Sequence, residues 1–150
     1  MHRQARVYVK TAFVQLLISV IVVALLLINA GLPLHPRLGL FLPIYYHLLM
    51  VGWATQLIGG VALWMFPVRS RERPRGDERL GWMAYGALNG GLLLRVVAEP
   101  AHAITPRSWS AWMLAVSALL QVCSVWFLII ALWPRVRERP KVNRSSMGGS

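Results

Sequence analysis

Apolar residues run almost without interruption through four long stretches of this chain, and polar residues collect between them. The stretches cover approximately residues 9–29, 41–66, 80–97 and 109–133. Each has the roughly 17 to 25 mostly apolar residues that a transmembrane helix needs. Backbone groups in lipid must bond to each other, and these runs are continuous rather than alternating, so the pattern predicts helices and not barrel strands.

Short connections between the four stretches predict an all-α protein, an up-down-up-down bundle of four transmembrane helices. We expect one domain over residues 1–140 and a disordered polar tail over residues 141–150. Proline cannot continue a helix, but it is tolerated in the first helical turn. The prolines therefore predict that Pro43 begins the second helix, and that the second, third and fourth helices end at Pro67, Pro100 and Pro134.

The net charge of +11 is distributed unevenly. Arginine and lysine gather before the first stretch, in the connection 68–79 and after the fourth stretch, whereas the other two connections carry one arginine each, Arg37 and Arg107. This alternation follows the positive-inside pattern, with both termini in the cytoplasm. We therefore expect a multi-pass protein of a prokaryotic inner membrane, whose partner is the lipid bilayer and not nucleic acid.

Glycines mark possible sites of close helix approach. Gly86 and Gly90 form a G-x-x-x-G pattern in the third helix, and the second helix contains Gly52, Gly59 and Gly60. Small residues at this spacing let transmembrane helices pack closely. We expect the second and third helices to pack against each other here, so that Gly90→Leu would disrupt the fold. A homodimer interface and room for a flat cofactor are the alternatives.

His47 is the only histidine that falls inside an apolar stretch. An ionisable side chain in the membrane is costly and usually functional, and imidazole is a common haem and metal ligand. A haem iron ligand, a hydrogen bond to a neighbouring helix and a proton relay are the three interpretations of His47. The outer connections contain His35 and His102, which we expect to be solvated turn residues.

Arg95 and Glu99 stand at the outer end of the third helix, at about the membrane level of His47. Their i, i+4 spacing places them on one helix face. Arg95 is expected to pair with Glu99, to extend toward the aqueous surface or, beside a haem, to bind its propionates.

A second axial haem ligand is not evident. Met50 shares a helix with His47, so it cannot cap the opposite face of the same iron. The ligand would come from a dimer mate, another subunit, Met83, Met113 or water, and an open position would bind a small gas.

The segment from His47 through Gly59-Gly60 to Pro67 resembles the haem-ligating helix of haem-copper oxidase subunit I (cytochrome c oxidase subunit I). In that family a histidine is followed by an apolar helix, a glycine-rich turn and a terminal proline. The same segment and the stretch 89–95 are similar to the NnrS family, which contains haem and is linked to nitric oxide. The resemblance covers roughly the second to fourth helices. It implies a haem-ligand role for His47 alone, because the copper-binding histidine cluster is missing.

We therefore expect a membrane protein that binds b-type haem for electron transfer or gas sensing, with His47 as the metal ligand and Arg95 near a propionate. It would act as a homo-oligomer or in a larger respiratory-type complex. Reduction of oxygen or nitric oxide is not expected. The alternative is a membrane scaffold, assembly or transporter subunit without a cofactor.

Overall fold

The computed structural model describes residues 2–66 and 78–135, and these residues form helices without any strand. The first rod is α1 (Arg3–Gly31). The second is a continuous helix that consists of the 3-10 turn η1 (Pro36–Phe41), α2 (Leu42–His47), the π-helix η2 (Leu48–Thr55) and α3 (Gln56–Met65). The remaining rods are α4 (Glu78–Ile104) and α5 (Ser108–Leu132), which ends in the 3-10 turn η3 (Trp133–Arg135). The predicted all-helical class is confirmed for the described residues.

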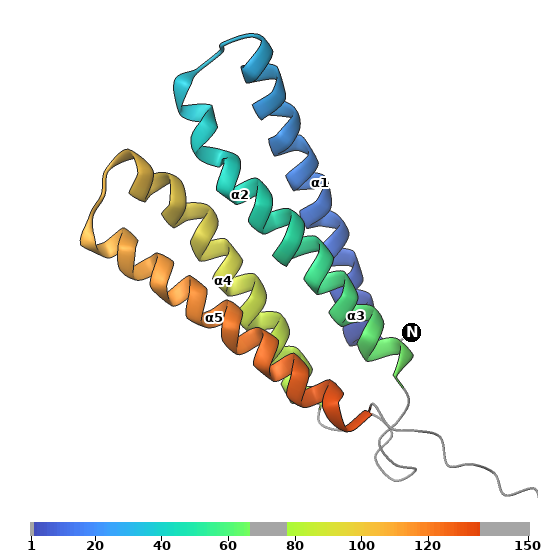
Figure 1. Ribbon diagram of the computed structural model, residues 1–150. Coiled ribbons are helices and arrows are strands. Elements are labelled where there is room, and N and C mark those ends of the chain that lie inside the picture. The colour runs from blue at the N-terminus through green and yellow to red at the C-terminus, as the bar shows by residue number, and fades with distance from the viewer. Residues whose placement is uncertain (1, 67–77, 136–150) are drawn as a thin grey trace, which may run out of the picture.

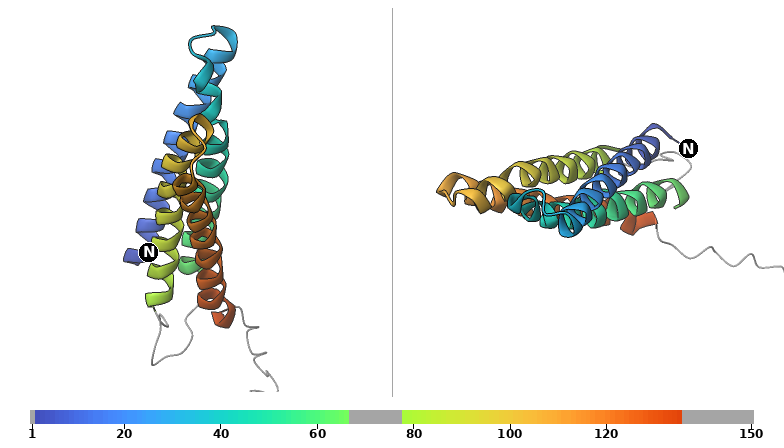
Figure 2. Two further views of the ribbon diagram at one scale, coloured as in Figure 1. Left: turned by 90° about the vertical axis from the view of Figure 1, so that its left-hand side faces the viewer. Right: turned by 90° about the horizontal axis from the view of Figure 1, so that it is seen from above.

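Successive rods run in opposite directions and pair as two hairpins (Figure 1). The first hairpin consists of α1 and the helix 36–65, and the second consists of α4 and α5. Both hairpin connections lie at one end of the molecule, here called the hairpin end; α1 and α4 begin at the opposite, terminal end. The same two pairs are seen from the side and from above in Figure 2.

Three of the rods are long and apolar enough to cross a membrane, namely Arg3–Gly31, Pro36–Met65 and Ser108–Leu132. They present many large apolar side chains outward, as a protein in contact with lipid does. α4 is 27 residues long but does not reach the same hydropathy, because it carries Asn89, Arg95 and Glu99 among its glycines. The structure thus supports association with a bilayer through three helices.

The observed helices are longer than predicted at two places. α1 begins at Arg3 rather than near residue 9, since its first turns pack on both α3 and α4 and bury Ala5 and Tyr8. The prediction that Pro100 ends the third helix is wrong, because α4 continues through it to Ile104. Ala98, fully buried, helps to hold this last stretch in place. Pro43 begins α2 as expected, whereas Pro67 and the tail 141–150 lie outside the described residues.

The predicted close packing through Gly86 and Gly90 is also wrong. A Cβ at either glycine would meet nothing within 4 Å. The glycine of α4 that is tightly packed is Gly91, where a Cβ would lie 2.9 Å from the Ser117 carbonyl oxygen of α5. In the second rod, a Cβ at Gly60 would lie 2.7 Å from Tyr8 Cβ of α1. Gly60 and Gly91 are therefore packed within a hairpin. Gly52 and Gly59 of the second rod face the other hairpin instead, since a Cβ at either would lie 3.0 Å from Leu92 of α4 or Leu128 of α5 respectively.

Heptad-spaced small residues form the contact between α4 and α5. Ala84, Gly91 and Ala98 of α4 are buried, and so are Ser110, Ser117 and Ser124 of α5. Ser117 donates a hydrogen bond to the Gly91 carbonyl oxygen at 2.6 Å, and Ser124 donates to that of Ala84 at 2.7 Å. Small residues allow the two backbones to approach, and each buried hydroxyl is satisfied across the interface. This contact fixes the rotation of α4 about its axis, and it therefore determines which face of α4 packs against the first hairpin.

A ladder of hydrogen bonds joins the two hairpins along α1 and α4, which run parallel. From the terminal end, Gln4 donates to the Glu78 carbonyl oxygen and Tyr8 to that of Gly81, at 3.1 and 2.7 Å. Two further pairs of side chains continue the ladder, Thr11 with Tyr85 at 2.8 Å and Gln15 with Asn89 at 2.8 Å. The ladder covers only the half of the interface nearer the terminal end. Toward the hairpin end α1 and α4 separate (Figure 1), and α4 contacts η1 and α2 instead.

Candidate functional site

His47 is the last residue of α2, where the helix changes to the π-helix η2. Its Nδ1 lies 2.8 Å from the carbonyl oxygen of Pro43, one turn earlier. A carbonyl can only accept, so Nδ1 carries the hydrogen and the lone pair of the neutral ring is at Nε2. The backbone thus orients the imidazole as it does in many metal-binding histidines.

Arg95 contacts this free nitrogen. Its Nη1 lies 2.5 Å from His47 Nε2 and 3.4 Å from Glu99 Oε1, and its Nε lies 3.5 Å from Ser117 Oγ. Glu99 Oε1 is also 3.8 Å from His47 Nδ1. His47, Arg95 and Glu99 therefore form one cluster, here called the polar triad, which connects the second rod to α4.

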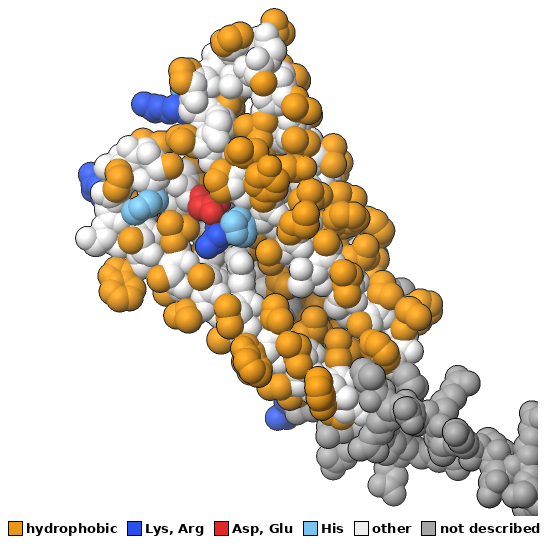
Figure 3. Space-filling model, in the orientation of Figure 1, with side chains coloured by type: hydrophobic (Ala, Val, Ile, Leu, Met, Phe, Trp, Pro, Cys, Tyr) orange, Lys and Arg blue, Asp and Glu red, His pale blue; other side chains and the backbone are white. Residues whose placement is uncertain are grey.

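The polar triad is partly exposed on an otherwise apolar surface. The side chains of His47, Arg95 and Glu99 are 26, 18 and 14% exposed. Figure 3 shows acidic, basic and histidine side chains gathered on this apolar face. The charges of Arg95 and Glu99 cancel, which reduces the cost of placing them among apolar helices. Glu99 Oε2 is buried and has no hydrogen-bond partner among the described residues.

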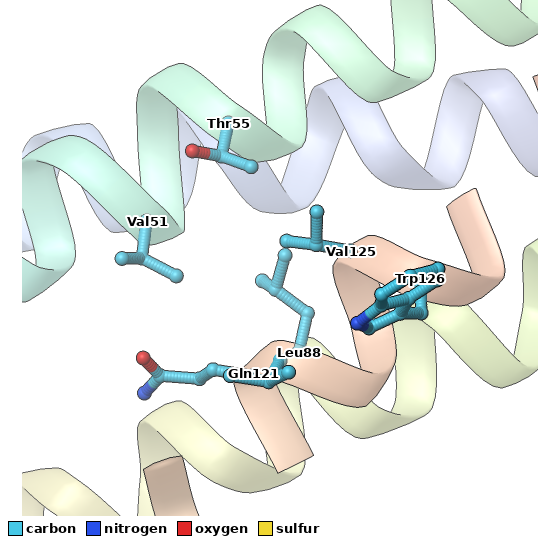
Figure 4. A pocket seen from close by; sticks show the side chains of 7 residues that line it. Val51, Thr55, Leu88, Gln121, Val125 and Trp126 are labelled. Carbon is cyan, nitrogen blue, oxygen red and sulfur yellow. The ribbon is translucent and has the colours of Figure 1, made fainter. Parts of the chain in front are cut away.

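Below the polar triad, toward the terminal end, a cleft of about 330 Å³ separates η2 from α5 (Figure 4). Val51 and Thr55 line the cleft at four-residue steps from His47. Gln121 lines the opposite wall and donates a hydrogen bond to Ser117 Oγ at 3.4 Å. The other lining residues are apolar: Leu88, Val122, Val125 and Trp126. The polar triad does not line this cleft; the cleft begins at Val51, about one helical turn from His47.

These residues fit one axial bond to a haem iron. His47 supplies an oriented imidazole, Arg95 supplies a cation beside it, and the cleft supplies apolar walls. The lone pair of Nε2 is engaged by Arg95, however, so this contact and an iron–nitrogen bond exclude each other. Of the two methionines named for a second axial bond, Met83 is 50% exposed and Met113 is partly buried. Among the described residues, no group of three or more His, Cys, Asp or Glu side chains gathers around a common point.

His35 and His102, the two histidines near the hairpin connections, differ in burial and in their hydrogen-bond partners. His35 is exposed and its Nδ1 accepts from the Arg37 amide at 3.1 Å, in agreement with a solvated turn residue. His102 was predicted in the same class, but it lies in the last turn of α4 and is partly buried. Its Nδ1 is 2.8 Å from Ser110 Oγ, so it ties the end of α4 to the start of α5. Sequence spacing did not reveal this bond.

The glycine pair of the family resemblance has a different local structure from the one expected. Gly59 and Gly60 lie inside α3 and are buried, and they form no turn. A Cβ at Gly59 would lie 3.0 Å from Leu128 Cδ2 of α5. These glycines therefore serve helix packing in this chain.

Sequence reasoning also missed two sets of residues that position the site, the serines of α5 and the ladder between α1 and α4. The signal for the first was present, since Ser110, Ser117 and Ser124 are seven residues apart. Ser117 matters most for the site because it contacts both Gly91 and Arg95.

Comparison with known proteins finds no protein-family model, no curated protein and no solved structure that matches this chain.

Proposed function

We propose that this chain is a four-span protein of a prokaryotic inner membrane that binds one b-type haem in the cleft between η2 and α5. His47 Nε2 would be the iron ligand. The observation that carries the proposal is the bond from Nδ1 to the Pro43 carbonyl oxygen at 2.8 Å. It leaves the lone pair on Nε2, the nitrogen that contacts Arg95 of α4, about one helical turn from the cleft.

Arg95 has a second role in this proposal. If Nε2 were to ligate iron, Arg95 would have to give up this contact, and its guanidinium would then be available to a haem propionate. Glu99 and Ser117 already hold the same side chain from two directions, at 3.4 and 3.5 Å. They would keep the cation near the site after the exchange.

The bound haem would supply an iron that changes between its ferrous and ferric states and, with an open sixth position, binds a small gas. Electron transfer and gas sensing are the two uses that this chemistry supports. The residues of this chain would ligate, orient and shield the group. We further propose that both termini face the cytoplasm and that the chain acts as a homo-oligomer or in a larger respiratory-type complex.

A scaffold or assembly subunit without a cofactor is the second candidate. It is favoured by the contact between Arg95 Nη1 and His47 Nε2, because that contact already satisfies the imidazole and joins the two hairpins. In that case the role of the polar triad would be to hold the two hairpins together.

Purification after haem-replete expression separates the two candidates. The haem proposal expects a pyridine haemochrome of the b type and about one iron per chain by metal analysis. Folded protein with a helical circular dichroism spectrum but neither iron nor a haemochrome would reject the haem and leave the scaffold.

A further inference from the structure

A second groove lies between α1, α2 and α4, on the side where the two hairpins separate. Its volume is about 500 Å³. Along α1 it extends from Thr11 to Val22, and along α4 from Tyr85 to Val96. Eleven helical residues correspond to a length of about 16 Å. Ile44 and Leu48, both buried, lie between these two walls.

The two ends of this groove differ in polarity. Thr11, Gln15, Tyr85 and Asn89 line the end nearer the terminal end of the molecule, where the ladder of hydrogen bonds stops. The rest of the lining is apolar. Leu93, 69% exposed, lies at the open side of the groove. An occupant would therefore enter from the lipid, with its polar part toward the ladder.

Hydrogen-bond donors remain available at the polar end. Gln15 Nε2 donates once, to Asn89 Oδ1, and Asn89 Nδ2 donates once, to the Tyr85 carbonyl oxygen at 2.9 Å. Each amide nitrogen has two hydrogens, so each keeps one. Thr11 and Tyr85 share a single bond between their hydroxyls, which leaves one further hydrogen. Gln15 Oε1 faces Gly52, where a Cβ would lie 2.6 Å from it, and this buried oxygen has no hydrogen-bond partner among the described residues.

Unsatisfied donors among apolar helices are costly, and a hydrocarbon chain offers them no acceptor. An isoprenoid quinone matches the groove better than an acyl chain. Its ring carbonyls are acceptors, and its tail is apolar like most of the groove lining. We propose that this groove binds a membrane-dissolved quinone, with a ring carbonyl accepting from the amides of Gln15 and Asn89. The proposal concerns binding only and does not depend on the haem.

The test measures retention of decylubiquinone by the full-length chain in detergent, in a preparation without haem, beside decylbenzene, which has the same tail but no carbonyls. We expect about one quinone per chain and at least tenfold weaker binding of decylbenzene. Asn89→Leu should weaken quinone binding about five- to tenfold, the equivalent of one lost hydrogen bond. Equal binding of the two compounds would show an acyl-chain groove and overturn the proposal.

Asn89 also belongs to the ladder, so a second variant avoids the risk of misfolding. Leu93→Trp at the open side of the groove should reduce quinone binding at least tenfold. The matched control is Leu119→Trp, at a residue of α5 that is 65% exposed and lies outside the groove. Unchanged binding in Leu93→Trp would also overturn the proposal. Because the preparation carries no haem, quinone binding and the Soret band are scored separately, and either proposal can fail alone.

Discussion

The polar triad combines a guanidinium, a carboxylate and an imidazole in one set of contacts between the second rod and α4. Arg95 is the centre, because it contacts both His47 and Glu99. Sequence reasoning placed these residues at one membrane level, and the pairing of Arg95 with Glu99 at i, i+4 spacing is confirmed. The contact between Arg95 and His47 could not be predicted, since it depends on how α4 is rotated about its axis.

Removing the Arg95 guanidinium should destabilise the protein, because the largely buried Glu99 carboxylate loses its paired charge. Arg95→Ala leaves Glu99 with only the imidazole nearby, and we expect the loss of up to about 3 kcal/mol in the free energy of unfolding. The double variant Arg95→Ala/Glu99→Gln should recover most of this loss, because no unpaired charge remains. Thermal melting in detergent measures both. A double variant that is no more stable than Arg95→Ala would show that the pair has no such coupling.

At the level of the helices, whether a glycine allows close packing depends on the side of the helix on which it lies more than on its spacing in the sequence. Gly90 and Gly91 are neighbours in sequence, but they differ by about 100° around α4. Gly90 is open, while Gly91 touches the Ser117 carbonyl oxygen and the Gln121 and Leu120 side chains of α5. The G-x-x-x-G pattern was read from spacing alone, and for that reason it indicated the wrong glycines.

Gly91→Leu should therefore destabilise the chain, whereas Gly90→Leu should not. Overpacking at Gly91 is expected to cost about 1–3 kcal/mol. The same substitution at Gly90 should change the free energy of unfolding by less than about 0.5 kcal/mol. Unfolding in mixed detergent, followed by circular dichroism, compares the pair. Equal effects at the two positions would contradict the observed packing of α4 on α5.

The ladder between α1 and α4 gives a second test at this level. Tyr8→Phe removes the hydroxyl that donates to the Gly81 carbonyl oxygen at 2.7 Å. Hydrogen bonds between membrane helices contribute about 0.6 kcal/mol on average, and we expect a loss of that size. Tyr46→Phe is the control, since Tyr46 is 52% exposed. A loss that is no larger in Tyr8→Phe than in Tyr46→Phe would mean that the ladder adds nothing to stability.

For the whole molecule, hydropathy predicted the number and order of the rods, because continuous apolar runs reflect burial in lipid. Hydropathy did not predict the helix bounds that depend on contacts between helices. α1 starts early because Tyr8 packs on α4, and α4 passes Pro100 because its end is held by α5. No residue pattern indicated the π-helix η2 or the two grooves.

Topology follows from the proposed four spans. Reporter fusions that end after Pro74 and after Arg107 should give opposite results, cytoplasmic for the first and external for the second, because basic connections stay inside. Reporters on the same side for both fusions would mean that α4 does not cross the membrane. α4 is the rod to examine, since its hydropathy is lower than that of the other three.

The haem-iron bond to His47 is the central claim, and one absorption measurement tests it most directly. His47→Gln keeps a side-chain oxygen that can accept from Arg95, but it removes the imidazole. The matched control is His102→Gln, at the histidine that binds Ser110 Oγ. After haem-replete expression, the Soret absorbance per folded chain should be retained in the wild-type chain and in His102→Gln and lost in His47→Gln. An unchanged Soret band in His47→Gln, or none in the wild-type chain, would contradict the account.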